Sequence, residues 1–144
     1  MRRIPASFAA PFALLAVATA LAEPVQAADL QVSIREARSQ DGQFQVALVD
    51  AAGYAGSAAP IAARLVAPAG AVTRVTLDGV PAGRYALMVI HDENGNGTLD
   101  TNLVGMPVEG YGFSNNPRVM RKPTFDEAAF DVGADALALD VAIR

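Results

Sequence analysis

The chain has 144 residues, with 11 lysine and arginine side chains against 15 aspartates and glutamates, one histidine and no cysteine. Without cysteine there is no disulfide framework, no thiolate zinc or iron–sulfur centre and no cysteine nucleophile. The single histidine excludes a histidine-rich metal site, and a net charge of −4 argues against nucleic acid as a partner. The length predicts one domain.

Residues 1–27 have the layout of a secretory signal peptide. Two arginines precede an apolar stretch over residues 8–22, and Val25-Gln26-Ala27 is suited to cleavage after the alanine. The apolar stretch contains a proline and is shorter than the roughly 20 residues that span a bilayer. We therefore expect a mature domain of residues 28–144, with 9 basic and 14 acidic side chains and a net charge of −5. Its expected location is the periplasm or the medium, without a membrane span.

The mature chain has the two-residue apolar period of β-strands. Apolar and polar residues alternate over 30–35 and 44–49, and Asp41-Gly42 between them is a turn signal. We expect these two strands to form a hairpin. A weaker apolar run over 61–66 predicts either a strand or a helical turn, and residues 72–77 predict a further short strand.

The clearest strand covers residues 84–91, which are apolar on both faces and so expected in the centre of a sheet. A long loop over 92–124 follows, and loops of that length are usually functional or tied down. Residues 125–132 predict a strand or a turn of helix, and 137–143 predict a closing strand. The pattern predicts an all-β fold, a single antiparallel, Ig-like β-sandwich of about seven strands.

The loop begins with oxygen-bearing residues in the spacing of a calcium-binding loop. Residues 92–100 read D-x-N-x-N-G-x-x-D, where a tight loop brings alternate side chains to one side and the glycine permits the reversal. Such hard oxygen donors suit Ca²⁺ better than a softer metal. The predicted ligands are the side chains of Asp92, Asn94 and Asn96, the backbone carbonyl of Thr98, and Asp100, directly or through water.

This pattern departs from an EF-hand in two respects. The twelfth position is Leu103, so the bidentate glutamate is missing, and a strand rather than a helix is predicted before the loop. Two carboxylate ligands predict weak binding, with a Kd of about 10⁻⁴–10⁻³ M. Glu109 is the candidate for a further carboxylate if the chain folds back. The alternative is a cluster of plain turns, since Asn-Gly occurs twice here.

Three side chains beside the loop are candidates for a ligand rim: His91, Tyr111 and Phe113. His91 ends the predicted strand, where it either takes part in metal binding or proton transfer or hydrogen-bonds the loop backbone. Tyr111 and Phe113 alternate across a glycine and form either an exposed platform for a ligand or a cap on the sandwich core. A small basic patch, which predicts a solvated face without an assigned partner, follows at Arg118, Arg121 and Lys122.

Four runs of residues resemble a known family. They are Gly83-Arg84-Tyr85-Ala86, residues 91–97 with Asp100, residues 105–116 (GMPVEGYGFSNN), and Pro123-x-Phe125-x-x-Ala128-x-Phe130. In this order they resemble the exported bacterial family known as domain of unknown function 2141. The resemblance extends over essentially the whole mature chain. It implies a small secreted β domain similar to transthyretin-like modules, and it implies no enzymatic activity.

These observations predict a non-enzymatic, exported module that contacts an envelope protein or a glycan through residues 92–117, with Ca²⁺ as its ion. The alternative is a hydrolase that uses carboxylates or the histidine beside the loop: Asp92, Asp100, Glu109 or His91. A serine hydrolase would pair His91 with a serine such as Ser114, but the chain has no G-x-S-x-G elbow. A third class is a purely structural domain without a small ligand.

Overall fold

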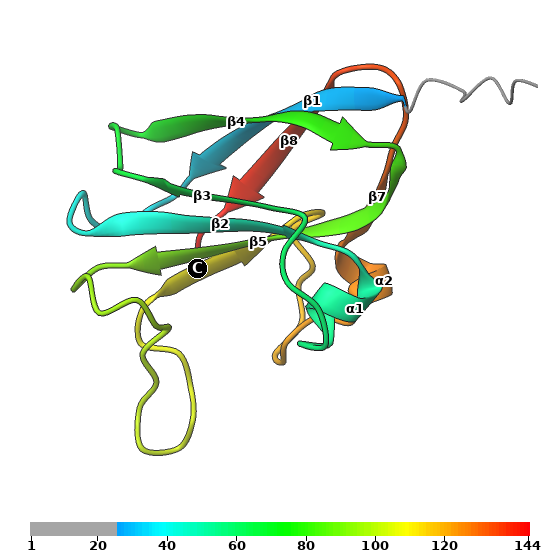
Figure 1. Ribbon diagram of the computed structural model, residues 1–144. Coiled ribbons are helices and arrows are strands. Elements are labelled where there is room, and N and C mark those ends of the chain that lie inside the picture. Colours follow the sequence, from blue (N-terminus) through cyan, green and yellow to red (C-terminus); the bar gives the residue numbers. More distant parts are fainter. Residues whose placement is uncertain (1–25) are drawn as a thin grey trace, which may run out of the picture.

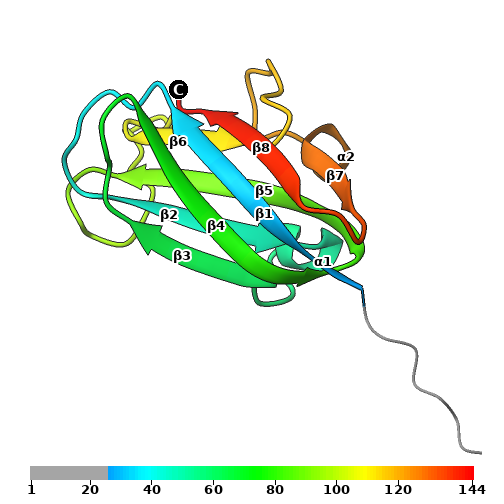
Figure 2. The same ribbon diagram turned by 90° about the horizontal axis from the view of Figure 1, so that it is seen from above.

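The computed structural model describes residues 26–144 (Figures 1 and 2). The expected signal peptide lies, except for its last two residues, outside the described residues. The described part contains eight strands and two helices of a single turn. The strands are β1 (Ala27–Arg35), β2 (Gln43–Val49), β3 (Ala62–Val66), β4 (Val72–Pro81), β5 (Gly83–Asp92), β6 (Gly110–Phe113), β7 (Ala129–Val132) and β8 (Leu137–Ala142), and the helices are α1 (Ala51–Tyr54) and α2 (Phe125–Ala128).

The strands form two sheets packed face to face, which confirms the predicted β-sandwich. One sheet has the order β4-β1-β8, and the other has the order β3-β2-β5-β6 with β7 also paired to β5 (Figure 1). Residues 84–91 are central as expected, because β5 has β2 along one edge and both β6 and β7 along the other. The run over 61–66 forms strand β3, and residues 125–132 contain both a helical turn and a strand.

The predicted hairpin of residues 30–35 and 44–49 is wrong. β1 pairs with β4 and β8, whereas β2 pairs with β3 and β5, so the two strands lie in different sheets. Each has one apolar face, and these faces pack against each other across the core, with Leu30 and Val32 on one side and Phe44 and Val46 on the other. Alternation shows which face a strand buries, but it does not show the strand beside it.

One strand pair departs from the expected antiparallel arrangement. β8 runs parallel to β1, with Leu30 opposite Leu137 and Ile34 opposite Val141 (Figure 2). The chain crosses from β7, in the larger sheet, to β8 along the free edge of β1, and a parallel pair needs such a crossover. All other strand pairs in residues 26–144 are antiparallel.

The two sheets also meet along one side, where β6 approaches the last residues of the chain. The backbones of Tyr111 and Arg144 exchange two hydrogen bonds, of 3.2 and 2.9 Å. Gly112 makes this approach possible, because a Cβ atom there would lie 2.6 Å from Cγ1 of Val141 and 2.7 Å from the carbonyl oxygen of Ala142. Since both glycines of β6, Gly110 and Gly112, face inward, the aromatic side chains between and after them face outward.

The outer face of the larger sheet carries the long loops. Figure 1 shows the segment after β5 and the segment between β6 and α2 on the side of this sheet away from the three-stranded sheet. None of the helices in residues 26–144 has the length and apolar character needed to cross a membrane. The fold therefore places residues 92–124 around one exposed sheet face.

Candidate functional site: the loop after strand β5 and the adjoining groove

Asp92 is the buried anchor of the loop. It has no exposed surface, and its two oxygens accept hydrogen bonds from the backbone N–H groups of three loop residues and from Gln45 on β2. Burial raises the pKa of this carboxyl, but the bonds from Gly97, Gln45 and Gly95 outweigh it and hold the pKa below its usual range. The charged carboxylate thus occupies all of its roughly four acceptor positions within the protein.

The other predicted side-chain ligands converge at the loop surface. Asn94 Nδ2 lies 2.6 Å from Oδ2 of Asp100, and Asn96 Nδ2 lies 2.9 Å from Oδ1 of the same carboxylate. The Asn96 amide oxygen accepts bonds from the backbone N–H and the hydroxyl of Thr98. The structure therefore brings Asn94, Asn96 and Asp100 together, and in this arrangement the loop is closed by its own hydrogen bonds.

Glu109 folds back onto the loop, as the chain approaches β6. Its Oε1 accepts the N–H of Glu93 and its Oε2 accepts the N–H of Asp100, both at 3.0 Å. The carboxylate is buried and bridges the two ends of the loop. Within residues 26–144, no group of three or more His, Cys, Asp or Glu side chains is placed to hold a metal ion. The calcium site predicted from the sequence therefore stays a prediction.

His91 lies inside the sandwich rather than on a rim. It is fully buried, packs against Phe44 with ring centroids 4.6 Å apart, and donates a hydrogen bond from Nε2 to the carbonyl oxygen of Asp41 at 2.9 Å. Its Nδ1 atom has no hydrogen-bond partner among the described residues, and the closest carboxylate oxygen is that of Glu93, at 3.9 Å. The bonded backbone belongs to the β1–β2 connection and not to the 92–100 loop.

Tyr111 and Phe113 are half-buried on the outer sheet face, with ring centroids 6.1 Å apart. They border an apolar groove of about 440 Å³, whose floor includes Met88 and Ile90 of β5. One wall comes from residues 99–107 and the other from residues 120–122, and the lining contains no Asp, Glu, Asn or Gln. We call this feature the outer-face groove. A concave, mostly apolar surface of this size matches small-molecule sites in proteins.

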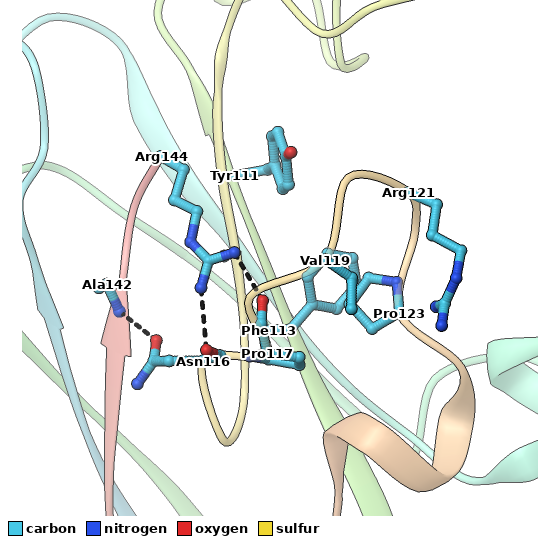
Figure 3. Close-up of a pocket in the computed structure, with 10 residues that line it drawn as sticks. Tyr111, Phe113, Asn116, Pro117, Val119, Arg121, Pro123, Ala142 and Arg144 are labelled. Atoms are coloured by element: carbon cyan, nitrogen blue, oxygen red, sulfur yellow. Dashed lines mark hydrogen bonds between the residues drawn. The ribbon is translucent and has the colours of Figure 1, made fainter.

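The second wall is held by polar residues that the sequence reading missed. Asn116 accepts the N–H of Ala142 at 2.8 Å, and the Arg144 guanidinium donates to the carbonyls of Asn116 and Pro117 (Figure 3). Asn116 also donates to the carbonyl of Asp140, at 2.8 Å. Asn116 has a φ of 47°, which asparagine tolerates better than most residues. The consecutive run Ser-Asn-Asn is a turn signal that could have indicated these roles.

Ser114 is buried and engaged in the main chain. Its hydroxyl accepts the N–H of Leu87 at 2.9 Å and donates to the carbonyl of Ala128. The hydroxyl thus joins β5 to the end of α2. Neither Ser114 nor His91 faces the outer-face groove, since neither is among the residues that line it.

Arg121 and Lys122 line the groove and also contact the two short helices. Arg121 makes two hydrogen bonds to Glu127, at 2.7 and 3.0 Å, and this contact together with the N–H of Thr124 lowers the pKa of Glu127 to about 2. Lys122 Nζ lies 4.2 Å from the ring centroid of Tyr54 and 3.2 Å from its carbonyl oxygen. Among the described residues Lys122 has no carboxylate partner.

Two packed sheets with a loop-walled groove on one outer face define a β-sandwich module with a surface site. The chain belongs to a family described as an uncharacterized protein conserved in bacteria, DUF2141, whose model matches residues 32–139. This match confirms the family resemblance seen in the sequence. No curated protein and no solved structure matches the chain.

Proposed function

We propose that the protein is a non-catalytic binding module of the bacterial cell envelope that binds its ligand in the outer-face groove. In this proposal the chain is exported and its signal peptide, residues 1–27, is cleaved off. The observation that supports this proposal is the groove itself. It has a volume of about 440 Å³, an apolar sheet face as its floor, and two loops as its walls, each fixed by hydrogen bonds. A pre-formed concave surface binds without the entropic cost of ordering its walls.

The contacts of the acidic side chains favour binding over hydrolysis. Asp92 accepts four hydrogen bonds, three of them from the loop backbone, and Glu109 accepts two backbone N–H groups. His91 is buried against Phe44. A general acid or base must reach a proton of the substrate, and these groups are directed to the protein's own backbone. Their arrangement supports a role in holding the loop.

Ca²⁺ is proposed as a weak stabiliser of the first groove wall. Asn94, Asn96 and the Asp100 carboxylate meet at the loop surface, while the oxygens of Asp92 and Glu109 already accept backbone N–H groups and Glu93 pairs with Arg38 at 2.8 Å. Rotation of the Asn94 and Asn96 amides would turn their oxygens toward Asp100. Because this rotation gives up the bonds to Thr98, we expect a Kd near 10⁻³ M.

Thermal unfolding in EDTA, millimolar Ca²⁺ and millimolar Mg²⁺ tests the ion. At tenfold its Kd a bound ion stabilises by about 1.4 kcal/mol, which is a rise of a few degrees. The rise is expected with Ca²⁺ alone, is lost in Asp100→Ala, and is kept in Asp135→Ala, an exposed control outside the loop. Equal unfolding temperatures in EDTA and Ca²⁺ would show that the loop is a cluster of turns and not an ion site.

Amide NMR spectra of the ¹⁵N-labelled protein test the groove. We would titrate three soluble probes: sodium dodecanoate below its micelle concentration, a peptidoglycan disaccharide-peptide, and an acidic apolar peptide. Saturable shifts confined to residues 88–90, 99–107, 111–113 and 120–122 would support a binding module of this face. Shifts scattered over both sheets, or none with all three probes, would overturn the proposal.

A further inference from the structure

We propose that the outer-face groove binds the acyl chain of an anionic single-chain amphiphile of the fatty-acid class, with the anionic head beside Lys122. This inference rests on the proposed binding function and names its ligand class. Three observations support it: the apolar side chains that line the groove, the absence of free backbone groups along β6, and the cationic side chains in the lining.

The lining is suited to a flexible apolar chain. Met88, Ile90, Met106 and Met120 come from three separate segments and meet around the groove, and Met106 and Met120 are 50% and 95% exposed. Methionine side chains are unbranched and adapt to irregular apolar shapes. Exposed apolar side chains gathered in one place indicate a surface that is covered when the protein functions.

The groove offers little to a peptide or a glycan. Both edges of β6 are already paired, one with β5 and the other with the backbone of Arg144, so an extended peptide cannot add as a strand there. No carboxylate or amide side chain lines the groove. Its polar side chains are those of Thr101, Tyr111, Arg121 and Lys122, too few to replace the hydrogen bonds to water that a peptide or a sugar would lose along the groove, whereas an acyl chain has none to lose.

The charged residues of the lining are both cationic, although the protein is acidic. Arg121 and Lys122 line the groove, and Arg118 lines the adjoining hollow that Met120 also borders, where Glu36 is paired with Arg35 at 2.7 Å. Glu127 neutralises Arg121, but neither Lys122 nor Arg118 has a carboxylate partner among residues 26–144. Lys122 uses one of its three N–H donors on the Tyr54 carbonyl, which leaves two for an anionic oxygen.

Calorimetric and NMR titrations with dodecanoate and with an uncharged lauroyl monoglyceride, both as monomers, test the proposal. Dodecanoate is expected to bind at one site, to shift the groove residues, and to bind more weakly at high salt. Lys122→Gln is expected to weaken dodecanoate binding about three- to tenfold and to leave the uncharged probe unaffected. The matched control Arg74→Gln, on β4 of the other sheet, retains full affinity.

A second pair of variants tests the apolar floor. Ile90→Gln is expected to weaken both probes about tenfold, and Leu65→Gln, an exposed position on β3 of the same sheet, is expected to change neither. If Ile90→Gln fails to fold, Met106→Gln replaces it, because that side chain is half exposed and contributes to the groove wall.

Each other outcome overturns the inference in a distinguishable way. Equal affinity for the charged and uncharged probes excludes the role of Lys122. Groove shifts with the disaccharide-peptide or the acidic peptide, but not with dodecanoate, exclude an acyl ligand and leave the binding module intact. Binding to anionic vesicles without binding of monomeric dodecanoate indicates a membrane-docking surface instead. Absence of shifts with every probe removes both the inference and the proposed function.

Discussion

Gln45 on β2 donates a hydrogen bond from Nε2 to Oδ2 of Asp92 at the end of β5, at 3.0 Å. This bond joins the first residue of the long loop to the neighbouring strand of the larger sheet. The remaining acceptor positions of the same carboxylate hold the next turn of the loop. The buried carboxylate therefore fixes residues 95–97, just before the first wall of the outer-face groove, to the sheet.

Replacement of this carboxylate is expected to destabilise the protein more than replacement of any exposed loop residue. Asp92→Ala leaves three backbone N–H groups and the Gln45 amide without their acceptor, and the unfolding temperature should fall by roughly 10 °C. Asp100→Ala removes bonds to two exposed amides and should cost about 2 °C or less in EDTA. Calorimetric unfolding of both variants in EDTA measures the difference, and equal effects would contradict the anchoring role.

Glu109→Gln is expected to loosen the loop without unfolding the domain. The glutamine side chain keeps one acceptor oxygen where the carboxylate has two, so only one of the N–H groups of Glu93 and Asp100 retains a partner. Amide hydrogen exchange should accelerate at one or both of these residues and stay unchanged at Val89 in the core of β5. Unchanged exchange at both loop amides would contradict the bridging role.

Acid is expected to destabilise the fold through two carboxyl groups. The pKa values of Asp92 and Glu127 lie below those of the unfolded chain, so both stabilise the fold above the unfolded pKa, and the contribution is lost as pH falls through the folded pKa. For Glu127 this window runs from 4.5 down to about 2. The unfolding temperature should therefore decline across it.

The variant Arg121→Gln isolates the Glu127 part of this decline. Without the guanidinium the pKa of Glu127 returns toward its ordinary value, so the variant is less stable than the wild type at neutral pH and the two curves converge near pH 2. Arg84→Gln, which removes an exposed ion pair to Asp126, is the control and should leave the slope unchanged. A constant gap between the wild type and Arg121→Gln at all pH values would contradict the assignment.

Gly112→Ala is expected to disrupt the contact between β6 and the end of the chain. The added methyl group would lie 2.6 Å from Val141 and 2.7 Å from the carbonyl oxygen of Ala142, and such overpacking costs about 1–3 kcal/mol. Gly133→Ala is the control, because nothing lies within 4 Å of a methyl group there. Chemical denaturation compares the stabilities of the two variants. Equal stability would show that β6 can move away from residues 141 and 142 at little cost.

The two-residue period of the sequence predicts the strands and the two layers of the fold, but it does not predict which strands lie next to each other. The alternation in residues 30–35 and 44–49 correctly identified two strands that each bury one face, yet their pairing was wrong because the 36–42 connection crosses between sheets. Sheet membership depends on long-range pairs such as Leu30 with Leu137, for which a single sequence holds no local signal.

The sequence predicts which segment contains the candidate site, but it does not predict which way the side chains of that segment face. His91 shares the two-residue period of Leu87 and Val89, and this phase indicates the interior, where the structure places it. The outward phase of Tyr111 and Phe113 follows from the glycines that alternate with them. The groove itself depends on residues 120–122 approaching β5, which no local pattern specifies.

The parallel pair of β1 and β8 imposes an order on folding. β1 lies in the middle of its sheet, and one of its two partners is the last strand of the chain. Contacts between residues so distant in sequence form slowly, because a long loop must close before they stabilise the chain. A nascent polypeptide thus lacks the complete three-stranded sheet until residues 137–142 emerge. The three-stranded sheet is therefore among the last parts of the fold to be completed as the chain is synthesised, because β1 gains its second partner only with β8.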